Sequence, residues 1–166
     1  MEPIYQKLLD MAYFELGEAF SGLADENVWK RPAPGLISIG EIAGHMAYWG
    51  VARLASEDGE SVPAEFGDSP LLDARFRYFP MTLATPPSAE HAGLSAKQVL
   101  DELIRLHRAA LAAFWQRGLD LASPPTGQNA EFTYEFLVQY QTFHLAYHTG
   151  QIYTARHLLG ETPPDN

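Results

Sequence analysis

Apolar residues along this chain recur at steps of three and four in four separate stretches, which is the spacing of an amphipathic helix. The stretches cover residues 4–23, 38–59, 95–118 and 132–160. No stretch shows the strict alternation of apolar and polar residues that is typical of a half-buried strand, and no internal repeat is present. The pattern therefore predicts an all-α protein with four long helices.

Each predicted helix has one face that we expect to point into a shared core. With Glu15 as a polar interruption, that face of the first helix carries Ile4, Leu8, Met11, Ala19, Phe20 and Leu23. The corresponding face of the last helix carries Leu137, Tyr140, His144, His148, Gln151 and Ala155. The second of these faces is the one that combines apolar residues with possible metal ligands.

Side chains that cap helices mark where several of these elements begin and end. Ser38 with Glu41, and Ser95 with Gln98, fit the capping box, in which each side chain bonds the backbone N–H of the other residue. Gly160 is suited to follow the last helix, because glycine readily adopts the left-handed conformation needed there. The caps support the helix boundaries that the periodicity indicates.

The connection between the second and third helices, residues 59–94, is by far the longest. Its five prolines are Pro63, Pro70, Pro80, Pro86 and Pro87, and its aromatic residues include Phe66, Phe76, Tyr78 and Phe79. Long loops in compact domains tend to be functional or to contain short elements. This one is long enough to cross the bundle, so the two helices that it joins can run parallel. We predict a single domain, residues 1–166, folded as a four-helix bundle with a long crossover between helices two and three.

The composition narrows the possible partners and sites. Eleven Lys and Arg against 21 Asp and Glu give a formal net charge of −10, which repels a phosphate backbone, so nucleic acid is not an expected partner. Cysteine is absent, which excludes disulfides, thiolate zinc sites and a cysteine nucleophile. No apolar run approaches the ~18 residues of a membrane-spanning helix, and the first residues lack the order of a signal peptide. We therefore expect a cytoplasmic protein without a membrane partner.

Three of the six histidines lie where we expect the core. His144 and His148 are four residues apart on the last helix, so both imidazoles can direct a nitrogen lone pair to one point. His45 lies on the inward side of the second helix, between Ile42 and Trp49. Burying three unpaired imidazoles would cost several kcal/mol, and a shared metal ion removes that cost. Three ligands with an open fourth position are typical of a catalytic metal site.

The other three histidines have weaker cases as ligands. His107 falls on the apolar stripe of the third helix and can approach the same cavity, as a ligand or beside one. His91 lies in the long connection, and we expect it to be solvated. His157 lies in the last turns of the fourth helix, where a partial positive charge suits the helix dipole.

Established metal motifs do not account for the triad. Leu145 stands where a zincin motif has its glutamate. Ferritin-like di-iron sites need a glutamate three residues before a histidine, and Gln141 holds that place for His144. A carboxylate-rich calcium loop is missing as well.

Further candidates surround these ligands. Glu41 precedes His45 by one helical turn and is a candidate general acid or base, with its place in the capping box as the competing interpretation. Tyr140, Gln141 and Gln151 are candidates to line the site or to orient ligands.

Two arginines continue the faces that carry the histidines. Arg53 and Arg156 are candidates to bind a carboxylate of the substrate or cofactor. The competing interpretation for each is a surface ion pair. The sequence does not choose between these two roles.

Two segments of the sequence resemble the DinB-like (DinB/YfiT-like) superfamily of metal-binding four-helix bundles. Trp29-Lys-Arg-Pro-Ala-Pro-Gly-Leu-Ile-Ser-Ile-Gly-Glu-Ile-Ala-Gly-His45 is similar to that family's tryptophan–proline connector, which leads into a helix with one ligand histidine. His144-Leu-Ala-Tyr-His148-Thr-Gly-Gln-Ile152 matches the family's HxxxHxGQI signature. The order of the segments and the helix lengths agree across essentially the whole chain.

The resemblance implies that His45, His144 and His148 bind Zn²⁺ or Ni²⁺, with water completing the shell, and that the protein forms homodimers. Some members resemble enzymes that use bacillithiol, mycothiol or glutathione, or a maleylpyruvate isomerase, while many have no assigned reaction. Because this chain has no cysteine, a reacting thiol would come from a low-molecular-weight cofactor. The first hypothesis is a metal-dependent S-transferase that acts on a small molecule. The alternatives are a metal-dependent hydrolase and a non-catalytic metal-binding or interaction protein.

Overall fold

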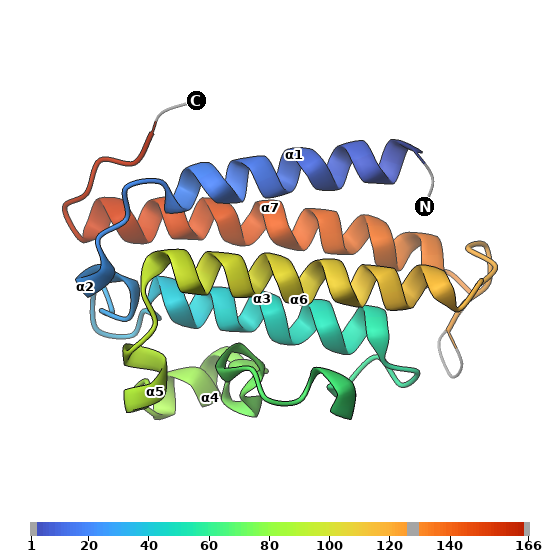
Figure 1. Ribbon diagram of the computed structural model, residues 1–166, viewed down its shortest axis with the longest axis horizontal. Coiled ribbons are helices and arrows are strands. Elements are labelled where there is room, and N and C mark those ends of the chain that lie inside the picture. The colour runs from blue at the N-terminus through green and yellow to red at the C-terminus, as the bar shows by residue number, and fades with distance from the viewer. Residues whose placement is uncertain (1–2, 126–129, 165–166) are drawn as a thin grey trace.

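The computed structural model describes residues 3–125 and 130–164, and within these ranges it contains helices and turns but no strand. The four long helices are α1 (Pro3–Phe20), α3 (Ile39–Ala55), α6 (Ala96–Gln116) and α7 (Tyr134–Leu158). They correspond to the four periodic stretches, so the all-α prediction is confirmed (Figure 1). Met1 and Glu2, which entered the argument about a signal peptide, lie outside the described residues.

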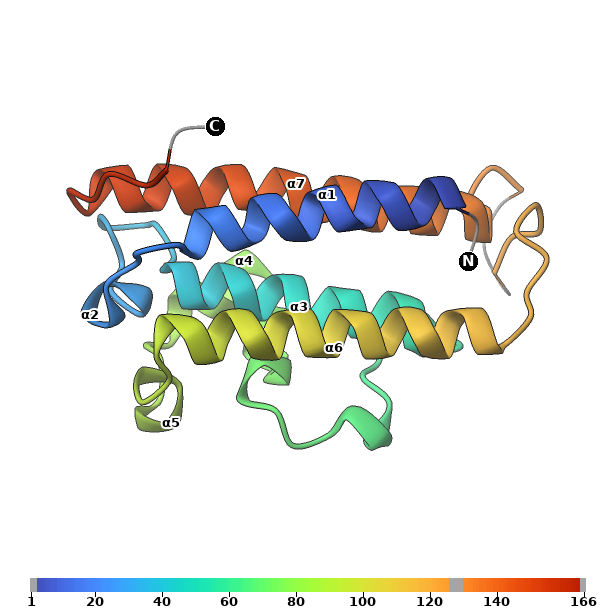
Figure 2. The same cartoon turned by 45° about the horizontal axis from the view of Figure 1, so that its top comes forward.

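The long helices form two parallel pairs (Figures 1 and 2). α3 packs along α6 and runs in the same direction, while α1 packs along α7 and both run the opposite way. The connection between α3 and α6 returns across the bundle to the end where α3 begins, and this return makes the pair parallel. The predicted crossover between the second and third long helices is therefore confirmed.

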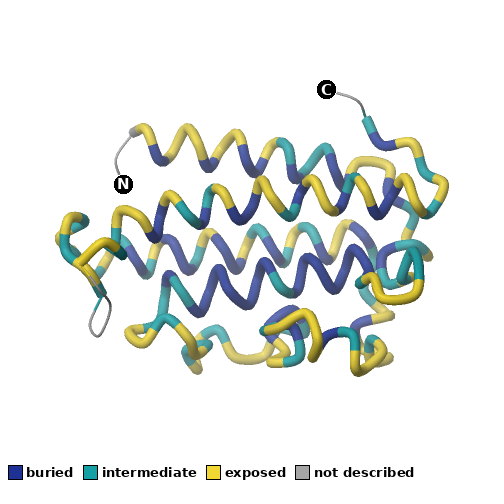
Figure 3. Tube along the Cα trace, turned by 180° about the vertical axis from the view of Figure 1, so that it is seen from behind, coloured by how far each residue is buried: buried dark blue, intermediate teal, exposed yellow. Residues whose placement is uncertain are grey.

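The crossover consists of short helical turns that pack against α3. They are η1 (Ala64–Phe66), η2 (Pro70–Leu72), η3 (Ala74–Phe76), α4 (Phe79–Ala84) and α5 (Ala89–Ala92). Leu71, Leu72 and Phe76 are buried, and η2 and η3 contact α3 directly. One further turn, α2 (Asp25–Val28), lies in the connector after α1. With these elements on one side and the bundle on the other, α3 is buried along nearly its whole length (Figure 3).

Local sequence accounts for the ends of the long helices. The capping boxes of Ser38 with Glu41 and of Ser95 with Gln98 are both present. Gly160 follows α7 with a φ of 83°, and its backbone N–H bonds back to a carbonyl of the last turn. These contacts satisfy backbone groups that a helix end otherwise leaves unpaired.

Two glycines of α3 allow large side chains to lie against its backbone. A Cβ atom at Gly44 would lie 2.5 Å from the ring of Phe76, and one at Gly50 would lie 2.8 Å from Cδ2 of His107. Real Cβ atoms essentially never lie so close to another heavy atom. The glycines therefore allow the crossover and α6 to approach α3 closely, and both approaches position residues of the site described below.

The predicted inward face of α1 is wrong over the first three turns. Ile4, Leu8 and Met11 are 55%, 39% and 68% exposed, and Phe14 extends this outer stripe. The residues that α1 buries are Tyr5, Leu9, Ala12, Tyr13, Leu16, Ala19 and Phe20. α1 carries two apolar stripes, and periodicity alone does not determine which one packs against the bundle.

The predicted inward face of α7 is confirmed only in part, because Leu137, His144 and Ala155 are buried as expected and the other three residues are not. The centre of the observed inward face is formed by Val138, Gln141, Leu145 and Ile152, all of which are buried. Tyr140 and His148 are half-buried and Gln151 is exposed. The histidine pair therefore lies at the edge of the inward face and borders the groove beside α3.

None of the helices in the described ranges combines the length and hydropathy needed to cross a membrane. The four long helices share one buried apolar core, which includes Leu9 of α1, Met46 of α3, Leu103 of α6 and Leu145 of α7. The cytoplasmic location stays a prediction from the sequence.

Candidate metal centre

The structure brings the three predicted ligand histidines together between α3 and α7. One ring nitrogen from each of His45, His144 and His148 lies within 4.8 Å of the other two. The Nε2 atoms of His144 and His148 are 3.1 Å apart, and the His45 ring centroid lies 5.3 Å and 4.9 Å from the centroids of those rings. Two helices from opposite halves of the chain thus assemble one compact group of imidazoles.

Hydrogen bonds behind the triad determine which nitrogen of two histidines carries the proton. His45 Nδ1–H donates to the backbone carbonyl of Phe76 at 2.8 Å, and His148 Nδ1–H donates to Gln151 Oε1 at 2.7 Å. A neutral imidazole that donates from Nδ1 keeps its lone pair on Nε2. Both Nε2 atoms are therefore available as ligands. Outer partners of this kind orient the histidines of many metal sites.

The surroundings keep all three imidazoles neutral. Burial lowers the pKa of His144 to about 2 and that of His148 to about 4, and it also lowers the pKa of His45. Neutral histidine is the form that binds metals. Two nitrogen atoms 3.1 Å apart, without an acid beside them, are well placed to share a cation. The residues present therefore fit a divalent metal ion.

A cavity of about 260 Å³ lies on the open side of the triad. Besides His45 and His144, its walls are Trp49, Arg53, Arg77, Tyr78, Phe79, Tyr140 and Gln141. Tyr140 stacks on the His144 ring with a centroid distance of 6.1 Å. Tyr78 and Phe79 come from the crossover, whose path no periodic pattern indicated. Among the described residues that line this cavity there is no carboxylate.

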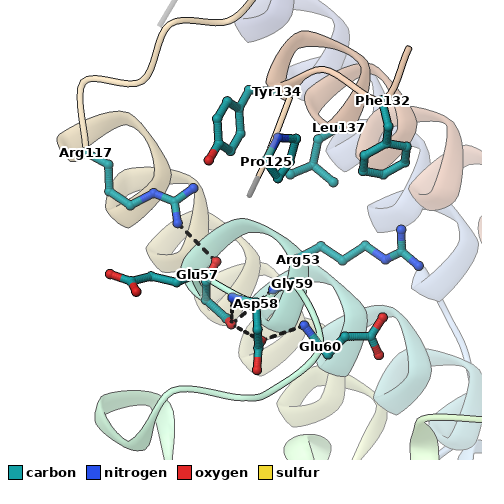
Figure 4. Close-up of a pocket in the computed structure, with 11 residues that line it drawn as sticks. Arg53, Glu57, Asp58, Gly59, Glu60, Arg117, Pro125, Phe132, Tyr134 and Leu137 are labelled. Atoms are coloured by element: carbon teal, nitrogen blue, oxygen red, sulfur yellow. Dashed lines mark hydrogen bonds between the residues drawn. The ribbon is translucent and has the colours of Figure 1, made fainter. Parts of the chain in front are cut away.

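Arg53 stands at this cavity, as its position after His45 on α3 suggested. Its guanidinium lies 4.8 Å from the centroid of Trp49 and 5.6 Å from that of Tyr140. None of the ion pairs in the described part of the chain involves it. A second cavity of about 260 Å³ lies beside it, with Arg117 and Tyr134 in its walls (Figure 4). Arg53 therefore offers an unpaired positive charge next to the triad.

Glu41 forms the predicted capping box, and its carboxylate is also paired with two arginines. Its Oε1 accepts from Arg31 and Arg75 at 2.7 Å and 2.9 Å. Its Oε2 accepts from Arg31 Nε at 3.0 Å and from the Ser38 backbone N–H at 2.8 Å. The carboxylate is fully buried and both oxygens are occupied. It links α3 to the connector and the crossover.

Arg156 is not at the cavity, and it is not a surface residue. It is 2% exposed, and it donates to the backbone carbonyls of Ala19 and Ser21, each at 2.9 Å. Its Nε pairs with Glu161 at 2.8 Å. The substrate-binding interpretation is therefore corrected, and the predicted ion pair is present but buried: Arg156 ties the end of α1 to the end of α7.

The expectation that His91 is solvated is wrong, since it is 3% exposed. Its Nδ1 bonds the Ser88 hydroxyl at 2.8 Å and its Nε2 bonds the carbonyl of Pro70 at 2.9 Å. Its ring packs against Trp29 and Phe76. The imidazole caps α5 and links it to η2 of the same crossover. No local pattern in the sequence indicated this role.

His107 lies behind the triad and does not belong to it. It is 1% exposed, and its Nδ1 lies 2.6 Å from the hydroxyl oxygen of Tyr13. The group of possible ligands contains His45, His144 and His148 but not His107. His157 is exposed in the last turn of α7, where the sequence placed it.

Comparison with known protein families agrees with this geometry. A family model described as the DinB superfamily matches residues 8–152, which run from α1 into α7 and include the three histidines. Neither a curated protein nor a solved structure matches the chain significantly. The match covers most of the chain, and the all-helical bundle is consistent with it. The chain belongs to the DinB superfamily.

Proposed function

We propose that this protein is a metal-dependent S-transferase, which joins a low-molecular-weight thiol to a small electrophile. The observation that carries the proposal is the open triad: three neutral imidazoles lie together, and two of them, His45 and His144, line a cavity whose described walls contain arginines and aromatic rings but no carboxylate. Membership of the DinB superfamily and the histidine cluster support a metal-binding protein.

His45, His144 and His148 would hold the ion, and imidazole ligands suit both Zn²⁺ and Ni²⁺. A bound divalent ion supplies Lewis-acid chemistry, which lowers the pKa of a thiol or of water beside it. The Phe76 carbonyl and Gln151 keep two of the rings in the ligand tautomer. The chain itself supplies orientation and a cavity that shields the reacting groups.

The walls of the cavity favour a thiol over water as the nucleophile. Hydrolysis benefits from a general base that moves protons, and the one carboxylate near His45 on α3, that of Glu41, is enclosed by arginines. A thiolate needs no further base: its sulfur forms a bond to carbon, and the leaving group departs with the electron pair of the broken bond. The thiol proton passes to solvent before the attack.

We further propose that Arg53 binds a carboxylate of the thiol or of the electrophile. A planar guanidinium recognises carboxylates through two parallel hydrogen bonds. The rings of Trp49 and Tyr140 limit the orientations that the Arg53 guanidinium can adopt, which reduces the entropy lost on binding. Arg77, which lines the same cavity, is by contrast paired with Glu60.

An apolar cavity beside the triad suits the rest of the electrophile. It has a volume of about 210 Å³, and Leu36, Ile42 and Leu158 are among its walls. Phe79 lines both this cavity and the one with the triad, and Gln151, which orients His148, lines it too. An electrophile with an apolar body could lie there with its reactive carbon toward the histidines.

The test combines metal analysis of the purified protein with thiol-consumption assays. The thiols are glutathione, bacillithiol and mycothiol, and the electrophile probe is 1-chloro-2,4-dinitrobenzene. We expect thiol loss that requires the metal, disappears in His148→Ala and persists in His157→Ala. Ester cleavage without any thiol would favour the metal-dependent hydrolase. A bound metal without activity against a broad panel would favour the non-catalytic metal-binding protein.

We also propose that the protein is a homodimer through the outer face of α1. Ile4, Leu8, Met11 and Phe14 form an exposed apolar stripe at steps of four, three and three residues. A second copy that packs the same stripe would remove this surface from water. Light scattering should show a dimer for the wild type and a monomer for Met11→Glu. A monomeric wild type would contradict the proposal.

A further inference from the structure

A row of polar side chains crosses the apolar core and ends at the triad cavity. Tyr13 of α1, His107 of α6 and Gln141 of α7 are 7%, 1% and 0% exposed. The Tyr13 hydroxyl oxygen lies 2.6 Å from His107 Nδ1. Gln141 lies beside the His107 ring and lines the cavity together with His45 and His144.

The end of this row nearest the cavity has polar atoms without partners. In the part of the chain that the structure describes, His107 Nε2 and both amide atoms of Gln141 make no hydrogen bond. Buried polar atoms of this kind are uncommon and costly in folded proteins. Gly50 leaves space for the His107 ring, because a Cβ atom there would lie 2.8 Å from it. Gly50 therefore lets His107 lie against α3 next to Gln141, and the cavity is the side from which a partner for the Gln141 amide can come.

The hydroxyl of Tyr13 determines the direction of the hydrogen bonds. Burial raises its pKa well above the usual value, so it keeps its proton. His107 Nδ1 is the one hydrogen-bond partner that the described residues offer this hydroxyl, so the O–H donates and Nδ1 accepts. An imidazole that accepts at Nδ1 carries its proton on Nε2. Gln141 is the side chain that interacts with His107, so its amide oxygen would accept from that N–H and its NH₂ group would remain for a ligand in the cavity that Gln141 lines.

We propose that Gln141 donates an N–H to the thiolate that occupies the open side of the histidine triad, with Tyr13 and His107 as positioning residues. This inference rests on the proposed function and adds a binding residue to it. A donor that is oriented in advance, inside a site of low dielectric constant, stabilises negative charge more than solvent water does. Gln141 thereby selects an anion at the open side over a neutral molecule.

The test uses the whole protein loaded with Co²⁺ and titrated with 2-mercaptoethanol, because a thiolate on Co²⁺ gives a charge-transfer absorption band. Gln141→Met keeps the unbranched side chain but removes the donor. We expect its dissociation constant for 2-mercaptoethanol to rise about tenfold while its Co²⁺ affinity stays the same. Gln139→Met, two residues earlier on the exposed side of α7, is the matched control and should have no effect.

Tyr13→Phe provides a second, more distant variant. Without the Tyr13 hydroxyl, His107 is no longer held in the tautomer that carries its proton on Nε2. We therefore expect a smaller rise in the dissociation constant for 2-mercaptoethanol, about threefold. Unchanged thiolate affinity in both variants would overturn the proposal. So would an equal loss of Co²⁺ affinity in Gln141→Met, because Gln141 would then act on the ligands. A wild type that binds Co²⁺ but shows no thiolate band overturns the proposed function as well, which distinguishes the two failures.

Discussion

Two polar centres lie one helical turn apart on α3, and they differ in how their hydrogen bonds are completed. At the first, Arg31, Arg75 and the Ser38 backbone direct four N–H groups at the two oxygens of Glu41. At the second, His45 joins two histidines of α7, the possible ligand nitrogens lie close to one another, and His45 and His144 line an open cavity. The first centre is closed by the protein, whereas the second leaves three ring nitrogens that could hold a metal ion.

The difference shows that completed hydrogen bonding, more than burial, distinguishes the Glu41 centre from the histidine triad. Arg156 and Arg53 repeat the contrast. Arg156 is buried and has a partner on each side, while Arg53 lies between two cavities, stacks near Trp49 and Tyr140, and takes part in none of the ion pairs among the described residues. Both arginines were equal candidates in the sequence, and only the contacts distinguish them.

The largest effect is expected at the open centre. His144→Ala should reduce affinity for Zn²⁺ at least about 1,000-fold, since even outer partners of ligands contribute about 10–100-fold. Elemental analysis and chelator competition measure the loss, and His157→Ala on the same helix is the matched control. If His45→Ala left metal stoichiometry and affinity unchanged, the triad would be wrong and His107 would be the next candidate.

Substitutions at the closed centre around Glu41 should lower the free energy of unfolding and leave metal affinity unchanged. Glu41→Gln leaves two arginines without their carboxylate, so we expect a loss of about 3–5 kcal/mol in the free energy of unfolding, measured in urea. Glu102→Gln, which breaks the exposed pair with Arg105, should cost about 1 kcal/mol or less. A Glu41→Gln protein with normal stability but weak metal binding would reverse the comparison.

His107 is the intermediate case, with one partner and one unpartnered nitrogen. Burial lowers its pKa from 6.5 to about 4, so the unfolded chain binds a proton in this window that the folded chain does not. The metal-free protein should therefore lose stability as the pH falls from about 6.5 to about 4, by roughly 3 kcal/mol from this group. Urea unfolding at several pH values should show a shallower dependence in His107→Gln, and an unchanged slope would contradict the prediction.

The smallest effect on the open centre is expected from substitutions of Gln151, which bonds His148 from behind the triad. Gln151→Leu removes the acceptor that orients His148, so Zn²⁺ affinity should fall about tenfold. Gln151→Glu keeps an acceptor and should retain the affinity of the wild type. Since Gln151 is exposed, thermal unfolding of the metal-free protein should be unaffected by either substitution.

The sequence by itself determined the four long helices, their caps and the histidine pair on α7. These features depend on residues within one or two helical turns, which the chain places together in any fold that keeps the helix. The closeness of His45 to that pair could also be predicted, because in a bundle inward positions of different helices must meet.

Tertiary structure alone decided how the site is completed. The Phe76 carbonyl behind His45, the aromatic walls from Tyr78 and Phe79, and the burial of His91 all depend on where the crossover packs. The choice between the two apolar stripes of α1 depends on α7 in the same way. These are contacts between segments far apart in the chain, and a local pattern of apolar and polar residues contains no information about which of them form.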